Sequence, residues 1–324
     1  MQKSLTRRAA IGIIAASTTF GSQAQNYPNK PVKIIVGFTA GGPTDSVARL
    51  IANQLSERLG QPFVVEARPG AAGSIGASYA AKQPADGYSL YLAVQTTHAV
   101  APYIYPNVGY DPEKDFTGVV RIAHNPLLMV VHPSFPAKNL AELVAYAKAN
   151  PGKINYSTGG IGSSPHMSVE LFRKTAGINV TSVHYKGDAA ALIDLVGGQV
   201  QMMMSSISGL LPSVQSGKLR PLAVSGLQRS PLVTDIPTIS ESGYPGFEVI
   251  TWFGLVAPAK TSPEIVDRIN REALNALKSP EVREQFNKQG FEVVPNSPIE
   301  FTRFIASENS KWGGLVKQLG IKVE

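Results

Sequence analysis

The sequence predicts an α/β protein with two lobes, and three observations support this prediction. From residue 30 onward, β-rich runs alternate with segments of helical periodicity, which is typical of parallel strands covered by helices. The 324 residues are enough for about two domains of ordinary size. Hydrophobic residues form 43% of the chain and charged residues 16%, so the chain is not a disordered, charge-rich protein.

Strand and helix cycles open the first predicted lobe. We expect strands over 32–38, 63–66 and 90–94 and helices over 46–59 and 74–82. The first of these helices has one apolar face, which carries Val47, Leu50, Ile51, Leu55 and Leu59 at helical spacing. Each predicted strand leads into a loop or turn that precedes the next element.

The second predicted lobe repeats this pattern, and a further strand and three helices follow it. Expected strands cover 127–131, 155–157, 180–185, 200–204, 222–224 and 251–256, and expected helices cover 139–149, 165–176 and 189–196. The last three helices begin near Pro263, Pro280 and Pro298, because proline is favoured in the first turn of a helix. We expect two sheets of parallel strands with helices on their faces.

Residues 1–24 form a predicted export signal, with cleavage after Ala24. Lys3, Arg7 and Arg8 give a positive start, an apolar stretch covers 9–20, and Ser22-Gln23-Ala24 fits the small-x-small cleavage pattern. The alternative is a membrane anchor, which needs about 20 apolar residues, and this run is shorter. Arg7-Arg8 is also compatible with twin-arginine export.

Composition and charge exclude several classes of function. Cysteine is absent, which removes disulfide frameworks, thiolate zinc sites, iron–sulfur clusters and cysteine nucleophiles. The signal holds three cations and no anion, so cleavage lowers the formal net charge from +7 to +4. The remaining lysines and arginines are dispersed, which argues against nucleic-acid binding. No later stretch is long and apolar enough to span a bilayer, and we expect a soluble exported protein.

Four loops that follow predicted strands are short and rich in glycine, serine and threonine. They span 39–45, 70–76, 158–166 and 185–190. In parallel α/β sheets, ligands bind at the carboxyl ends of the strands, where loops enter helices. Glycine lets the backbone approach a ligand closely, and the first N–H groups of a helix attract anions. The sequence therefore predicts an oxyanion site built mainly from main-chain and hydroxyl donors.

Each loop also has a purely structural interpretation. Thr44 or Asp45 would cap the helix that follows, and residues 70–76 would serve the packing of a helix on the sheet. Ser163 and Ser164 precede a helix that starts with proline, so they would both cap it and point donors outward. We favour ligand contact for these two serines.

A lysine and four aromatic residues remain open between two roles. Lys186 is either a solvated surface group or a ligand contact in its glycine-containing loop. Phe38, Tyr185, Trp252 and Phe253 are expected in the core, although one of them could form a wall of a cleft.

The sequence lacks the motifs of common enzymes. It contains no G-x-x-x-x-G-K-[ST] phosphate loop and no G-x-S-x-G elbow, and Gly70, Gly73 and Gly76 have the wrong spacing for G-x-G-x-x-G. None of the five histidines forms H-E-x-x-H or lies three to five residues from another, so we expect no metal site. Ser163 and His166 leave one catalytic alternative, an exported hydrolase.

Eight segments resemble the extracytoplasmic substrate-binding receptors of tripartite tricarboxylate transporters, also called the Bug family. They are YPNKPVKIIVGFTAGGPTDSVARLIA from Tyr27, VVEARPGAAGSIGA from Val64, PADGYSLYLA from Pro84, YDPEKDF from Tyr110, NPGKINYSTGGIGSSPH from Asn150, VHYKGDAAALIDLVGGQVQ from Val183, SGKLRPLAVSGLQRSPLVTDIPTISESGYPGFEV from Ser216 and TWFGLVAPA from Thr251. In order, they run through essentially the whole chain after the signal.

This resemblance implies a two-lobed, type II periplasmic-binding-protein fold (a Venus flytrap), with two sheets flanked by helices. The first lobe would be discontinuous, over 25–124 and 226–324, and the second would cover 125–225. The resemblance further implies a periplasmic receptor that is not an enzyme and needs no cofactor. It would bind a small-molecule organic acid and deliver it to membrane transporter subunits, and we expect a monomer. A solute-binding module that signals to a sensor protein is an alternative.

The resemblance also implies where the ligand binds. Main-chain donors of the A-G-G-x-T-D loop would hold one carboxyl group, and loops from both lobes would complete the pocket. The candidate ligand-binding residues are Phe38, Ala40, Gly41, Gly42, Thr44, Asp45, Ala72, Gly73, Thr96, Thr97, His98, Gly160, Ser163, Ser164, His166, Tyr185, Lys186, Gly187 and Ser205.

One departure from the family pattern bears on the ligand. Family members commonly carry a Phe-Asp pair after the G-G-Q-V-Q strand, where this chain has Met203-Met204-Ser205-Ser206. Loss of that acid removes a negative charge or a water acceptor from the expected cleft. We therefore expect a di- or aromatic carboxylate rather than an amino acid, because an ammonium group needs such an acceptor.

Overall fold

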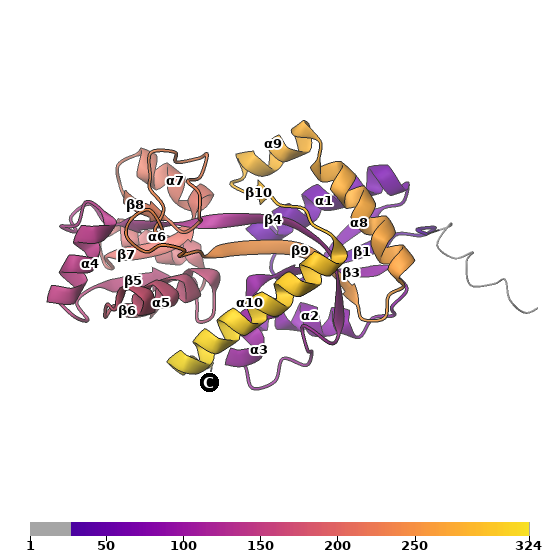
Figure 1. Cartoon of the computed structure of the whole chain (residues 1–324), viewed down its shortest axis with the longest axis horizontal. Helices are drawn as coiled ribbons and strands as arrows, with labels where there is room; N and C mark the ends of the chain where they lie inside the picture. The colour runs from indigo at the N-terminus through magenta and orange to yellow at the C-terminus, as the bar shows by residue number, and fades with distance from the viewer. Residues whose placement is uncertain (1–26, 324) are drawn as a thin grey trace, which may run out of the picture.

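The computed structural model describes residues 27–323, so the predicted signal and its cleavage site lie outside the described residues. Figure 1 shows two lobes side by side, each a sheet with helices packed around it, joined by two strands that run between them. The predicted fold class, a two-lobed α/β protein with sheets flanked by helices, is therefore confirmed.

The first lobe combines the N-terminal strand and helix cycles with the C-terminal helices. Its elements are β1 (Val32–Val36), α1 (Pro43–Leu59), β2 (Phe63–Ala67), η2 (Ala71–Gly73), α2 (Ser74–Ala81), β3 (Ser89–Val94), η3 (Thr96–Val100), α3 (Ala101–Ile104), α8 (Pro263–Leu277), α9 (Pro280–Lys288), β10 (Glu292–Val293) and α10 (Pro298–Leu319). β1 pairs in parallel with β2 and β3, so the carboxyl ends of the three strands meet at one edge. The last three helices begin at the three predicted prolines.

The second lobe holds the middle of the chain. Its elements are α4 (Leu140–Ala149), β5 (Asn155–Thr158), α5 (Ser164–Ala176), β6 (Thr181–His184), α6 (Asp188–Val196), β7 (Met202–Ser206), α7 (Ile207–Gln215) and β8 (Arg220–Val224). β5 pairs in parallel with β6 and β7, which again places three carboxyl ends at one edge. Helix α7 is absent from the prediction, and Pro212 inside it explains why, because proline in a helix interior is unfavourable.

Two strands, β4 (Phe116–Val131) and β9 (Ile250–Pro258), connect the lobes. They pair antiparallel with each other, and the far end of β4 pairs antiparallel with β7 and β8. β9 also pairs antiparallel with β3, which gives the strand order β2-β1-β3-β9-β4-β7-β5-β6, with β8 and β10 beside β4. The expectation of parallel sheets is therefore wrong for β4, β8, β9 and β10, whose strand pairings are antiparallel. Alternation along the sequence does not specify which distant segments pair.

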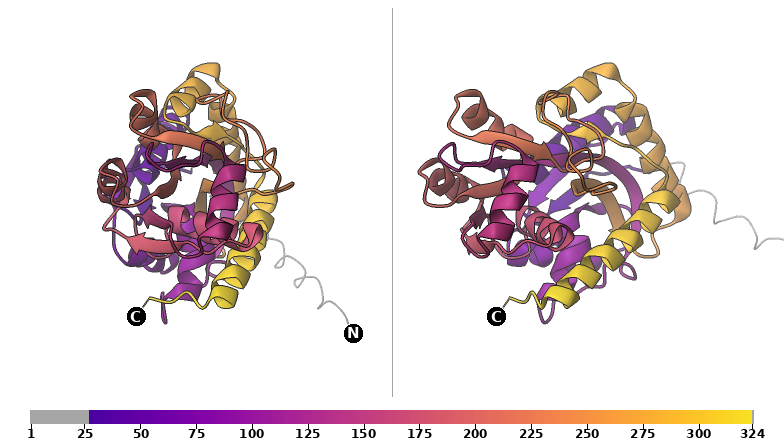
Figure 2. Two further views of the ribbon diagram at one scale, coloured as in Figure 1. Left: turned by 90° about the vertical axis from the view of Figure 1, so that its left-hand side faces the viewer. Right: turned by 60° about the vertical axis from the view of Figure 1, so that its left-hand side comes forward.

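Helix α10 extends along both lobes, as Figures 1 and 2 show in three orientations. Its residues Trp312 and Val316 belong to the same hydrophobic cluster as Phe172 of α5. A buried carboxylate fixes the helix on β9, because Glu308 Oε2 accepts the indole N–H groups of Trp252 at 3.0 Å and of Trp312 at 2.8 Å. The core position predicted for Trp252 is confirmed, and α10 ties the two lobes together.

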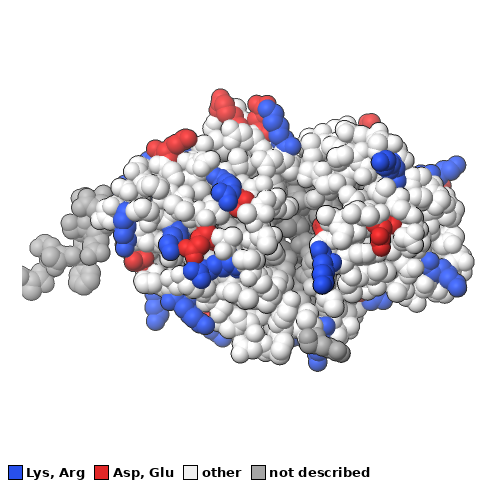
Figure 3. All heavy atoms as spheres, turned by 180° about the vertical axis from the view of Figure 1, so that it is seen from behind, with Lys and Arg blue, Asp and Glu red and all other residues white. Residues whose placement is uncertain are grey.

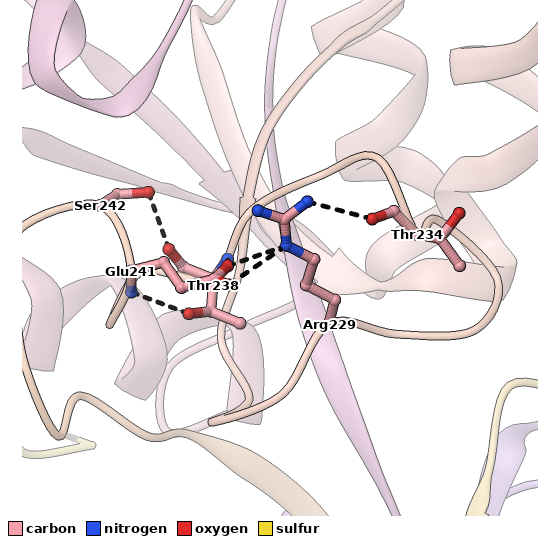
Figure 4. Close-up of polar contacts among 5 residues, drawn as sticks. All are labelled: Arg229, Thr234, Thr238, Glu241 and Ser242. Atoms are coloured by element: carbon pink, nitrogen blue, oxygen red, sulfur yellow. Dashed lines mark hydrogen bonds and ion pairs between the residues drawn. The ribbon is translucent and has the colours of Figure 1, made fainter.

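The long loop between β8 and β9 is held by the polar contacts drawn in Figure 4. Arg229 Nε donates to Glu241 Oε2 at 3.0 Å, and the same oxygen accepts the main-chain N–H of Thr238 at 2.7 Å. Thr238 also forms an isolated bridge with Val224 at the end of β8. Phe247 of this loop packs in the hydrophobic cluster that contains α5 side chains.

The residue boundaries given for the two lobes in the sequence analysis stay a prediction.

His98 lies inside the aromatic core of the first lobe. The residue is 0% exposed, and its ring centroid lies 5.0 Å from that of Phe116 and 5.7 Å from that of Tyr91. Nδ1 shares a hydrogen bond of 3.0 Å with Thr97 Oγ1, while burial lowers the pKa of His98 to about 3. The side chain of this candidate ligand residue therefore packs as part of the core.

We predict that the free energy of unfolding falls as the pH is lowered from 6.5 toward 3. The unfolded chain binds a proton on His98 near the usual histidine pKa of about 6.5, whereas the folded protein resists protonation down to about pH 3. The stabilisation is thus complete above pH 6.5 and is lost progressively below it. The variant His98→Phe keeps a ring but cannot titrate. Between about pH 6 and pH 4, the slope of its free energy of unfolding against pH should be lower than that of the unsubstituted protein by about 1.4 kcal/mol per pH unit.

Urea denaturation at a series of pH values measures this slope. His132→Gln is the matched control, because it removes a histidine that is partly exposed and lies outside the aromatic core, and the change of slope in His98→Phe should exceed the change in this variant. An equal slope in His98→Phe and in the unsubstituted protein would contradict the prediction.

Candidate functional site

Three loops of the first lobe meet at the carboxyl ends of β1, β2 and β3. A Cβ atom on Gly37 would lie 2.6 Å from both Gly73 O and Tyr91 Oη, so the loops after β1 and β2 are in direct contact. A Cβ atom on Gly73 would lie 2.5 Å from Thr97 Cγ2 and 3.0 Å from Phe38 Cε2. Gly73 also has a φ of 89°, a left-handed conformation that favours glycine. The structure thus brings Phe38, Gly73 and Thr97 together.

The loop after β1 folds around the carboxylate of Asp45. Its Oδ2 accepts the main-chain N–H of Gly41 at 3.0 Å and Nε of Arg49 at 2.8 Å, and the bond to Arg49 lowers the pKa of Asp45. The expected cap of α1 by Thr44 or Asp45 is wrong, because α1 begins at Pro43 and its N-cap is Gly42, with no side-chain cap. The first N–H groups of α1 therefore remain available to an anion.

Three loops of the second lobe meet in the same way beyond β5, β6 and β7. Tyr185 N–H donates to Thr158 O at 2.9 Å, and Gly187 N–H donates to Gly159 O at 3.1 Å. Ser163 caps α5 as predicted, accepting the main-chain N–H of His166 at 3.3 Å. These bonds hold the glycine-rich loop against the loop that enters α6.

Ser205 and an acid that the sequence analysis did not single out form a pair at this edge. Ser205 Oγ donates to Asp188 Oδ2 at 2.7 Å, and Asp188 Oδ1 lies directly against Gly159. Burial raises the pKa of the Asp188 carboxyl, although Ser205 and the main chain of Gly159 both donate to it. The pairing of β5 with both β6 and β7 brings residues 188 and 205 together, so local sequence gives no signal for this contact.

A buried hydrogen bond joins the two sets of loops across the lobes. Ser164 Oγ, at the start of α5, donates to Gln95 Oε1, at the end of β3, at 2.7 Å. A Cβ atom on Gly162 would overlap Ile104 Cδ1 of the first lobe. Figure 3 shows the groove between the two halves on the face opposite that of Figure 1, with lysine, arginine and acidic side chains scattered over both halves.

Four buried polar atoms in or beside the first-lobe loops have no hydrogen-bond partner in the described chain: Asp45 Oδ1, Ser74 Oγ, Gln95 Nε2 and His98 Nε2. A buried polar group without a partner costs about 1–3 kcal/mol. Gln95 was missed in the sequence analysis, and its only local signal is a polar residue directly before Thr96 at the end of an apolar strand.

Two candidate residues of the loop before α6 are placed differently from each other. The hydroxyl of Tyr185 donates to Asp194 Oδ2 at 2.7 Å, which raises the pKa of Tyr185 to about 12 and turns this group toward α6. Lys186 is exposed. Among the other candidates, Ala40, Gly41, Ala72 and Gly160 lie on accessible parts of their loops, whereas Thr44 and Thr96 are buried.

The polar groups of α5 do not form a nucleophile and base pair. His166 Nδ1 accepts the main-chain N–H of Gly162 at 3.1 Å, and Ser163 Oγ shares a hydrogen bond of 2.9 Å with Thr158 Oγ1. Burial lowers the pKa of His166 to about 4, so the ring is neutral at pH 7. Within residues 27–323, no group of three or more histidines and acids could hold a metal ion. The arrangement offers main-chain and hydroxyl donors, which suits anion binding.

Comparisons with known proteins cover most of the chain. A family model described as "Tripartite tricarboxylate transporter family receptor" matches residues 47–321. Protein BugT from Bordetella pertussis is 37% identical over 319 residues, which cover 98% of each chain. The structure of R. palustris Rpa4515 with adipate is similar with a TM-score of 0.81 and 39% identity, covering 91% of this chain and 99% of that one. MatC from Rhodopseudomonas palustris with bound malate has a TM-score of 0.77 and 34% identity, covering 90% and 100%.

We predict that Ser163→Ala lowers the free energy of unfolding by about 0.5–2 kcal/mol, because α5 loses its side-chain cap. Ser262→Ala is the matched control, since Ser262 also precedes a helix that starts with proline but makes no side-chain cap bond. Chemical denaturation of both variants measures the difference. Equal losses in the two variants would show that the Ser163 hydroxyl does not stabilise α5.

Proposed function

The chain belongs to the family of tripartite tricarboxylate transporter receptors, and on that premise we propose that it captures an organic carboxylate between its lobes and delivers it to a membrane transporter of that type. Members of this family are solute-binding receptors and not enzymes, which removes the hydrolase alternative. The observation that carries the proposal is the meeting of two sets of glycine- and hydroxyl-rich loops, joined by the bond between Ser164 and Gln95.

Two similar structures support an acidic ligand. One contains adipate and the other malate, and both compounds are dicarboxylates. In this chain one carboxylate would sit at the start of α1, against the N–H groups that no side chain caps. The second end of the ligand would meet the loops after β5, β6 and β7. A dicarboxylate or an aromatic carboxylate is the ligand class that we propose.

Affinity requires both lobes. A charge-assisted hydrogen bond contributes about 1.5–3 kcal/mol net, and a helix N-terminus adds about 0.3–1 kcal/mol, or up to ~2 when partly buried. Micromolar binding needs about 8 kcal/mol after costs of ~4–15 kcal/mol for lost freedom. One loop cannot supply this amount, so we propose that the ligand is enclosed by closure of one lobe on the other.

We propose that the protein works in the periplasm as a monomer, after removal of residues 1–24. Receptors of this family act outside the cytoplasm. No helix within the described residues has the length and apolarity needed to cross a membrane. The partners would be the small organic acid and the membrane subunits of the transporter.

Titration calorimetry on the ligand-free protein tests the proposal. A panel of di-, tri- and aromatic carboxylic acids should include at least one that binds, and the bound acid should be recovered chemically unchanged. The absence of binding to every acid of the panel, in protein verified to be ligand-free and folded, would overturn the proposal.

We also predict that Gly42→Val abolishes carboxylate binding and leaves the fold intact. A Cβ atom on Gly42 would have only Thr39 O within 4 Å, at 3.8 Å, and the extended backbone of Gly42 (φ −87°, ψ 175°) accommodates valine. The added methyl groups would obstruct the approach of a carboxylate to the start of α1. Affinity should fall at least tenfold, about 1.4 kcal/mol, with a smaller loss in Gly42→Ala. Unchanged affinity in the folded valine variant would show that the carboxylate binds elsewhere.

A further inference from the structure

The N-terminal half of helix α10 is anchored on the first lobe. Phe301 and Ile305 belong to a hydrophobic cluster that also contains side chains of β3 and α2. A Cβ atom on Gly254 of β9 would overlap the ring of Phe301, so the helix and the strand are in close contact. The buried carboxylate of Glu308 adds its bond to the indole of Trp252. This half of the helix is therefore fixed on β9 and on the first lobe.

The C-terminal half of α10 reaches the second lobe. Leu315 and Val316 pack in the hydrophobic cluster that contains Phe172 of α5, and Lys174 of α5 donates to Gln318 Oε1. The same cluster includes side chains of η3 and α3, so this half lies where the two lobes meet. The helix has 22 residues, about 33 Å of length, and Figures 1 and 2 show it running along both lobes. A stiff element thus links the lobes in addition to β4 and β9.

Two adjacent glycines, Gly313 and Gly314, lie in α10 where its contacts pass from one lobe to the other. A Cβ atom on Gly313 would overlap the ring of Tyr103, so packing against α3 requires glycine there. A Cβ atom on Gly314 would have no contact within 4 Å outside the helix backbone among the described residues, and Gly314 is exposed. Glycine inside a helix is less favourable than alanine, because it loses more backbone entropy. Packing therefore explains Gly313 but gives no reason for Gly314.

We propose that α10 bends at Gly314 when one lobe closes on the other, so that both ends of the helix keep their contacts. The inference rests on the proposed function, because it describes how the closure in that proposal takes place. Detachment of either half would expose buried apolar side chains, such as Phe301 or Leu315, which is unfavourable. Sharp bends in helices concentrate at proline and at pairs of glycine or serine. Bending at the glycine pair therefore costs less than detachment.

Two other roles of Gly314 make different predictions. As an ordinary surface position, it would accept alanine with a gain in stability and no effect on the lobes. As part of a flat surface on which another protein docks, it would also leave the movement of the lobes unchanged. The movement of the lobes therefore distinguishes bending from both alternatives.

The experiment measures the distance between the lobes in the ligand-free protein. The chain lacks cysteine, so Glu57→Cys on α1 and Lys148→Cys on α4, both at exposed positions, carry one spin label on each lobe. Double electron–electron resonance gives the distribution of distances between the two labels. It is recorded for this labelled protein and for Gly314→Ala and Ser310→Ala in the same background. Ser310 is exposed one turn before Gly314, so its variant controls for a gain in helix propensity without the loss of a glycine.

Gly314→Ala should unfold at a higher urea concentration than the labelled protein, because alanine is the better helix former. It should nevertheless have a narrower distribution of distances between the lobes, whereas Ser310→Ala should keep the broad distribution. The double variant Ser310→Gly/Gly314→Ala should recover the broad distribution, because it returns a glycine to the same face of α10. In calorimetry, a carboxylate that binds the unsubstituted protein should bind Gly314→Ala about threefold more weakly.

Equal distributions in Gly314→Ala and the labelled protein, the same narrowing in Ser310→Ala, or no recovery in the double variant would overturn this inference and leave the proposed function intact. Failure of every carboxylate to bind would overturn the proposed function. The distances in the ligand-free protein decide the inference in either case.

Discussion

The antiparallel pairing of β4 with β9 is the constraint on which the rest of the structure depends. β4 pairs with β9 over one part of its length and with β7 and β8 over the other, so the two sheets are parts of one hydrogen-bonded path. The parallel strands on either side of this pair direct their carboxyl ends toward the region between the lobes. Because loops at the carboxyl ends carry the helix N-termini, the pairing positions two sets of anion-attracting loops opposite each other.

The resulting site uses backbone and hydroxyl groups in preference to reactive side chains. Glycine at position 73 lets the loops after β1, β2 and β3 approach within van der Waals distance of one another, since any side chain there would collide with Thr97 or Phe38. The hydroxyl groups of Ser163 and Ser164 have structural roles, because one caps α5 and the other bonds to Gln95. In the function that we propose, such a site would bind and release a solute without altering it.

Buried polar groups set the energetics of the region between the lobes. Gln95 uses its carbonyl oxygen to bond across the lobes and leaves its amide nitrogen unpartnered in the described chain, whereas the carboxylate of Asp188 accepts the hydroxyl of Ser205. The unpartnered nitrogen of Gln95 costs about 1–3 kcal/mol.

Local sequence determined much of this molecule. Helices begin at Pro263, Pro280 and Pro298 because proline fixes the backbone of a first turn, and the apolar face of α1 follows from helical spacing. The glycine-rich loops can be identified from the sequence alone. The family resemblance can also be identified from it, and the comparisons confirm that resemblance. Tertiary structure alone decided that β4 and β9 run antiparallel, that His98 packs into an aromatic core, and that Asp188 meets Ser205. These outcomes depend on contacts between residues far apart in the chain, and neither periodicity nor local conformational preference contains that information.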